Sequence, residues 1–140
     1  MWQEAALFLV LTLLAYQDYR EKKVNLFILL ISGAAGTLAQ AIAGQYTAGN
    51  LIAGIGVGAA VCLFSGVTRG KIGMGDGLVI VLCGIFLGFE RNIMLCMAAI
   101  YLAGAAALLL FLMKKRGRNY RMPFVPFLWA SYVVNLLWNM

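Results

Sequence analysis

The sequence predicts an all-α membrane protein with about six transmembrane helices, and its composition and the layout of its apolar runs support this class. Hydrophobic residues make up 64% of the 140 residues and charged residues 11%, whereas a soluble domain has about 45–50% and about 25%. The mean hydropathy of +0.91 also excludes a disordered chain. Since six helices of ~20 residues would occupy about 120 positions, a single membrane-embedded domain over residues 1–140 is expected.

Charged and polar residues divide the chain into six apolar stretches. They are Ala5–Gln17, Asn25–Ala43, Leu51–Val67, Ile72–Phe89, Asn92–Met113 and Pro123–Trp138. The second, fifth and sixth are long and free of charge. The first is short, and because Glu4 and no basic residue precedes it, it is not expected to be a cleaved signal peptide. The fourth is interrupted near its start by glycines and an aspartate.

Basic residues predict the orientation of these helices. Ten of the 11 lysines and arginines lie in the first, third and fifth loops. They are Arg20, Lys22, Lys23, Arg69, Lys71, Lys114, Lys115, Arg116, Arg118 and Arg121. Because cytoplasmic loops are enriched in basic residues, these loops are expected in the cytoplasm and both termini outside. The net charge of +6 therefore indicates topology, and no nucleic-acid partner is expected.

The two aspartates are the candidate catalytic residues. Asp18 ends the first stretch and Asp76 opens the fourth, so both lie beside predicted cytoplasmic loops. A carboxylate in lipid costs a few kcal/mol, so each is expected to face a wet cavity or a partner. If the two meet, they share one proton, and the pair can both activate a water and protonate a carbonyl oxygen.

Two further features of the composition bear on this site. The chain has no histidine, which excludes histidine metal ligands and general bases, and no metal or cofactor is expected. Gly73, Gly75 and Gly77 surround Asp76, and such a density of glycine argues against a helix start before Asp76. A flexible loop that presents the acid to the cavity is therefore expected.

Three segments resemble one protein family. The G-M-G-D at Gly73–Asp76 resembles the G-x-G-D signature of intramembrane aspartyl proteases. The D-Y-R-E-K-K-V-N at Asp18–Asn25 resembles the segment that supplies the other aspartate in type IV prepilin peptidases. The M-P-F-V-P-F at Met122–Phe127 is similar to the start of that family's last helix. The chain length resembles the short, peptidase-only members of tight-adherence (Flp) pilus and preflagellin systems.

The resemblance implies an aspartic endopeptidase of the cytoplasmic membrane. Its substrate would be a prepilin, pseudopilin or preflagellin-like membrane precursor, cut after a glycine between a basic leader and an apolar helix. Asp18 and Asp76 would be catalytic, and Gly73 and Gly75 would shape the motif. Two positions depart from the family pattern: Leu78 replaces a usual lysine, and Asn25 stands where proline is common. The cysteine-rich loop of the longer, N-methylating members is absent, so the resemblance does not decide whether this chain methylates.

Two other functions stay open on the sequence alone. A small proton- or cation-coupled transporter also needs intramembrane carboxylates, but Asp18 and Asp76 are expected near one membrane face, whereas carriers place their sites at the midplane. A non-catalytic pilus or secretion assembly protein could share the fold. The retention of both acids argues against that alternative, because keeping a carboxylate in lipid is costly.

Overall fold

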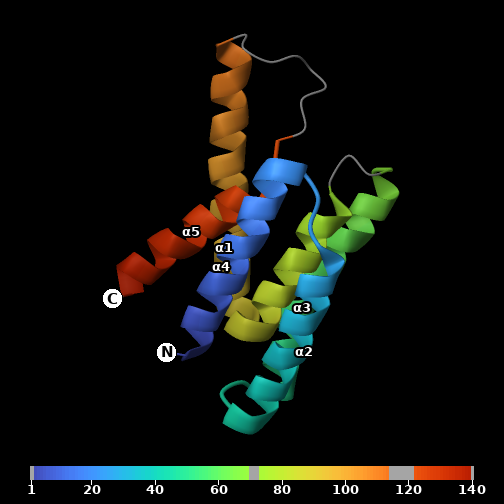
Figure 1. Ribbon diagram of the computed structural model, residues 1–140, viewed down its shortest axis with the longest axis vertical. Helices are drawn as coiled ribbons and strands as arrows, with labels where there is room; N and C mark the ends of the chain where they lie inside the picture. The colour runs from blue at the N-terminus through green and yellow to red at the C-terminus, as the bar shows by residue number, and fades with distance from the viewer. Residues whose placement is uncertain (1, 70–72, 114–121, 140) are drawn as a thin grey trace.

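The structure, a computed structural model, describes residues 2–69, 73–113 and 122–139, in which all regular elements are helices (Figure 1). The helices are α1 (Trp2–Glu21), α2 (Leu26–Ala43), α3 (Ala48–Val67), α4 (Met74–Leu112) and α5 (Val125–Asn139). Among them, α2, α3 and α4 are long and apolar enough to cross a membrane, with mean hydropathies of 1.9, 1.9 and 2.4. The prediction of an all-α membrane protein is confirmed.

Six separate crossings are not established by these helices. The first predicted stretch lies inside α1, which is 20 residues long but has acidic and basic residues at its ends. The sixth was expected from Pro123, whereas α5 begins at Val125 and has 15 residues, about 22 Å against a hydrocarbon core of about 30 Å. The predicted fourth and fifth stretches share the single 39-residue α4, Met74–Leu112, except for Gly73 and Met113, which flank it, and Ile72, which lies outside the described residues.

A break at Gly88 divides α4 into two arms, residues 74–87 and 89–112. Gly88 has φ 71° and ψ −173°, which is not a helical conformation. The Asn92 side-chain Nδ2 donates a hydrogen bond to the Ile80 carbonyl oxygen at 3.2 Å, although 12 residues of straight helix span about 18 Å. The arms therefore fold back beside each other, as the sharp corner of α4 in Figure 1 shows. The predicted separation between the fourth and fifth stretches is close to this corner.

Close contact between backbones joins α3 to the first arm of α4. A Cβ atom placed on Gly54 would lie 2.8 Å from the Gly84 carbonyl oxygen, and one on Gly77 would lie 2.9 Å from the Cys62 backbone nitrogen. No side chain fits at these positions. Small residues at such contacts allow the dense packing that holds helices together in lipid, where burial of apolar surface supplies little driving force.

A second packing region lies between α1 and α5. Leu7, Leu11 and Leu14 are fully buried along one face of α1, because residues spaced three and four apart share a helix face. Leu128 and Tyr132 of α5 are buried in the same hydrophobic core. Asp18 follows Leu14 by four residues, so this buried face of α1 also carries the first aspartate.

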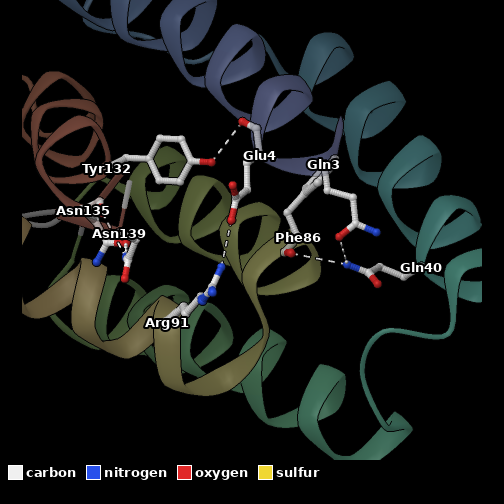
Figure 2. Close-up of polar contacts among 8 residues, drawn as sticks. All are labelled: Gln3, Glu4, Gln40, Phe86, Arg91, Tyr132, Asn135 and Asn139. Atoms are coloured by element: carbon white, nitrogen blue, oxygen red, sulfur yellow. Dashed lines mark hydrogen bonds and ion pairs between the residues drawn. The ribbon is translucent and has the colours of Figure 1, made fainter. Parts of the chain in front are cut away.

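Polar contacts tie α1 to α4 and α5 at the end of α1 that is remote from Asp18 (Figure 2). The Arg91 Nη1 and the Glu4 Oε1 form an ion pair at 2.9 Å. The Tyr132 hydroxyl donates to the Glu4 backbone carbonyl oxygen at 3.0 Å. Arg91 lies three residues beyond Gly88, so these contacts hold the corner of α4 against the start of α1.

Replacing Gly88 with alanine is expected to destabilise the protein. A Cβ atom at Gly88 would lie 2.9 Å from the Asn50 Oδ1, which accepts a hydrogen bond from the Phe89 backbone nitrogen at 2.7 Å. The backbone conformation also strongly disfavours a side chain, so Gly88→Ala should lower the free energy of unfolding by about 1–3 kcal/mol. Thermal unfolding in detergent measures this loss.

Gly56→Ala is the matched control, because a Cβ atom at this helical glycine of α3 meets nothing within 4 Å. Alanine lowers the conformational entropy of the unfolded chain, so Gly56→Ala should raise the free energy of unfolding by about 0.4–1 kcal/mol. A Gly88→Ala protein as stable as the unaltered protein would contradict the account of the corner.

Candidate active site

Asp18 lies at the C-terminal end of α1, and its side chain is buried, with 5% of the residue exposed. Its Oδ2 accepts a hydrogen bond from the backbone nitrogen of Val125 at 3.1 Å. Val125 is the first residue of α5, and N–H groups in the first turn of a helix have no partner within the helix. The contact therefore satisfies this N–H group and places the carboxylate at the positive end of α5.

The chain leaves α1 at Lys22, four residues after Asp18. The backbone nitrogen of Lys22 donates to the Asp18 carbonyl oxygen at 2.9 Å, and Lys22 has a left-handed φ of 51°. This contact ends α1 in the manner of a left-handed C-cap. The Asn25 side chain then accepts from the Phe27 backbone nitrogen at 3.0 Å and caps α2. Asn25, which departs from the family pattern, thus acts as the N-cap of α2.

Asp76 lies in the first turn of α4, which begins at Met74. Its backbone nitrogen donates to the Gly73 carbonyl oxygen at 3.1 Å. The expectation that the glycines prevent a helix start before Asp76 is therefore wrong. The physical reason is that these glycines serve close contacts, so helix propensity does not decide their conformation.

The two glycines of the motif leave space for different groups. A Cβ atom on Gly73 would lie 2.8 Å from the Asp76 Oδ2, so the carboxyl group folds back over a position that has no side chain. A Cβ atom on Gly75 would lie 3.2 Å from the Cγ2 of Val24, which belongs to the loop between α1 and α2. Gly73 thus makes room for the acid, and Gly75 lets the loop that follows Asp18 pack against the start of α4.

One cavity of about 1120 Å³ is lined by both aspartates. Lys22 and Lys23 also line it, whereas most of its remaining surface is apolar and comes from α3, both arms of α4 and residues 122–124. Both carboxyl groups therefore lie on one shared space, and two carboxyl groups that approach each other resist being ionised together. The arrangement can therefore hold one proton between two acids around a shared space.

All four residues that the sequence singled out, Asp18, Gly73, Gly75 and Asp76, line this cavity. Leu78 lines it as well, so the family's usual lysine is replaced by an apolar side chain at the site itself. Of the predicted cytoplasmic basic residues, Lys71 and the five between positions 114 and 121 lie outside the described residues.

Two features of the site were missed by the sequence analysis. Lys22 and Lys23, which were assigned to orientation only, also line the cavity, and their position four and five residues after Asp18 was the available signal. The hydrogen bond from Val125 to Asp18 had no signal in the sequence, because 107 residues separate the two groups.

Two aspartates line one cavity of this helical membrane protein, and an aspartic protease needs two carboxyl groups on a shared space. The chain matches the type IV leader peptidase family over residues 5–112 and belongs to that family. Its members are aspartic-type prepilin peptidases, and this protein is an enzyme of that type. The matched range contains Asp18 and Asp76 but not α5. No curated protein and no solved structure matches the chain at a significant level.

Gly73→Ala is expected to lower peptidase activity more than stability. Gly73 has an extended backbone, φ −64° and ψ 126°, which alanine adopts freely, but the new Cβ atom would displace the Asp76 carboxyl group. Because a misplacement of ~1 Å can reduce a rate ~100-fold, we expect roughly a 10- to 100-fold loss of kcat/KM. Cleavage assays together with thermal unfolding measure both effects.

The control for Gly73→Ala is Gly66→Ala, at an exposed glycine of α3 where a Cβ atom meets nothing within 4 Å. Its activity should equal that of the unaltered protein. Unchanged activity of Gly73→Ala would show that the glycine does not position the acid.

Val125→Pro is expected to reduce activity because proline has no backbone N–H to donate to Asp18. Proline is well tolerated at the first position of a helix, so the main change is the lost hydrogen bond to a carboxylate, worth about 1.5–3 kcal/mol. Val125→Ala keeps the donor and removes only buried methyl groups. We expect Val125→Pro to lower kcat/KM at least fivefold more than Val125→Ala, and equal effects would argue against a positioning role for this bond.

Proposed function

We propose that this protein cleaves the basic leader from a prepilin-like membrane precursor, using Asp18 and Asp76 as a pair that activates water. The observation that carries the proposal is the single cavity of about 1120 Å³ lined by both carboxyl groups. Membership of the type IV leader peptidase family supports prepilin-like substrates. In this proposal residues 1–140 act as one membrane-embedded peptidase domain.

The two acids take different roles in the proposed reaction. Asp18 is the ionised member, since the Val125 N–H and the positive end of α5 stabilise its charge. Asp76 carries the shared proton. Asp18 removes a proton from water as the water oxygen bonds to the peptide carbonyl carbon, and Asp76 protonates the carbonyl oxygen. A neutral tetrahedral intermediate forms without a covalent bond to the enzyme.

Collapse of this intermediate cuts the peptide bond and restores the site. The bond between the carbonyl carbon and nitrogen breaks, and Asp18 gives its proton to the departing amine. A hydroxyl of the intermediate returns a proton to Asp76 as the carbonyl forms again. The products are the leader with a free carboxyl group and the mature chain with a free amine. One water is consumed.

The proposed cut lies at the cytoplasmic face of the membrane. Arg20, Lys22, Lys23 and Arg69 are described residues in the first and third loops or their flanking helix ends, and basic residues favour the cytoplasmic side. In Figure 1 the start of α1 and the end of α5 both lie lower than the α1–α2 and α3–α4 connections, which supports placing both ends on the opposite side of the membrane. A leader left in the cytoplasm would then bring the cut bond to the depth of the aspartates.

Asp18→Asn and Asp76→Asn are each expected to abolish leader removal, with a loss of at least ~1000-fold, because an amide can neither accept nor donate the required proton. The measurement is coexpression with a prepilin-like precursor, followed by gel mobility of the leader. Glu21→Gln is the matched control: Glu21 lies three residues after Asp18, is exposed and does not line the cavity.

Full processing by either asparagine variant would refute the proposed pair. The same comparison in detergent separates the peptidase from a transporter, since detergent abolishes any ion gradient. Cleavage that persists there, and that depends on Asp18 and Asp76, excludes a function that requires a gradient.

A further inference from the structure

One face of the second arm of α4 lines the cavity, and much of this arm is exposed among the described residues. Ile100, Ala103, Gly104 and Ala107 line the cavity, and their spacing of three and four places them on a single helix face. Ile100 is 54% exposed, and Gly104 and Ala107 are also exposed. The arm extends beyond the other helices in Figure 1. We refer to this face, residues 100, 103, 104 and 107, as the small-residue face.

The small-residue face is shaped for close approach by another helix. Ala103, Gly104 and Ala107 have no side chain beyond Cβ, and a Cβ atom added at Gly104 would meet nothing within 4 Å. Small residues on a membrane helix allow a second backbone to come near, which strengthens dispersion contacts. By contrast, Gly54 and Gly77 are already covered by α4 and α3. Gly104 therefore differs from these filled glycine contacts.

The remaining residues that line the cavity restrict what can occupy it. Val61 and Phe64 of α3 form part of the apolar lining, while Asp18, Asp76 and two lysines lie in the same cavity. At about 1120 Å³ the cavity exceeds the ~300–1,000 Å³ of a typical small-molecule site. An elongated apolar ligand with one polar segment suits this lining. A lipid chain is also elongated and apolar, but it contains no peptide bond on which the two acids could act.

We propose that the apolar helix of the precursor docks on the small-residue face of α4, with its first turn beside Asp18 and Asp76. This inference rests on the proposed function, because the occupant is the substrate of that peptidase. Close approach of the two helices depends on the small side chains of this face. A bulky side chain on this face of α4 would hold the precursor helix away, so that the scissile bond of the precursor no longer reaches the acids. Continuity between this face and the two aspartates within one cavity carries the argument.

Gly104→Leu tests the docking face. Two substrates are compared: the full membrane precursor, and a short peptide that contains the leader and cut site but ends within the first turn of the apolar helix. We expect the ratio of kcat/KM for the precursor to that for the peptide to fall at least tenfold in Gly104→Leu. Gly104→Ala should lower the ratio less, because it adds only one methyl group.

Gly56→Leu is the matched control, since Gly56 is an exposed helical glycine with nothing within 4 Å of its Cβ position and does not line the cavity. Its ratio should equal that of the unaltered protein. A precursor whose first helical turn carries alanine in place of bulky residues should recover most of its cleavage by Gly104→Leu. Recovery of this kind requires direct contact between the two helices.

Two outcomes would overturn the docking proposal: an unchanged ratio in Gly104→Leu, which includes equal losses on both substrates, or the same fall of the ratio in Gly56→Leu. The proposed function fails by a different result in the same assay, namely cleavage by Asp76→Asn. If Asp76→Asn is inactive and the ratio in Gly104→Leu is unchanged, the docking face is therefore rejected and the peptidase proposal is retained.

Discussion

The backbone contact between α3 and the first arm of α4 is the constraint on which the site depends. A Cβ atom at Gly58 would collide with the backbone of Val81, so the two helices touch without intervening side chains. In lipid, dispersion at such short range replaces the hydrophobic driving force of water. The Asn92 side chain adds a hydrogen bond at 2.9 Å to the Gly54 carbonyl oxygen. That bond links the second arm of α4 to the same contact.

The two acids reach one cavity because separate contacts hold the helices that carry them. Val24 packs over Gly75, which fixes the chain after Asp18 against the start of α4. The hydrogen bond from Val125 to Asp18 brings α5 to the same place. Since each contact joins segments far apart in the chain, the site forms only after the bundle has assembled. Its geometry is a property of tertiary packing, with each acid placed at a helix end.

The candidate acids were predictable, whereas the role of the surrounding glycines was not. Asp18 and Asp76 are the chain's two aspartates. An acid beside apolar stretches indicates a functional site, because a carboxylate in lipid is energetically costly. Glycine, however, has two uses that look alike in a sequence: conformational freedom and close approach. Gly73 and Gly75 were interpreted as a flexible loop, yet close contacts with the Asp76 carboxyl group and Val24 explain them. Only neighbours in space distinguish the two uses.

The sequence by itself determined the helical membrane class, the break between the two arms of α4, the pair of acids and the family, because hydropathy, charge and short motifs are local properties of a chain. Tertiary structure decided which surfaces meet. It placed Asn92 against Ile80 across the corner at Gly88 and brought Asp18 to the start of α5. These pairings depend on distances between distant segments, which follow from packing and cannot be obtained from the order of residues along one helix.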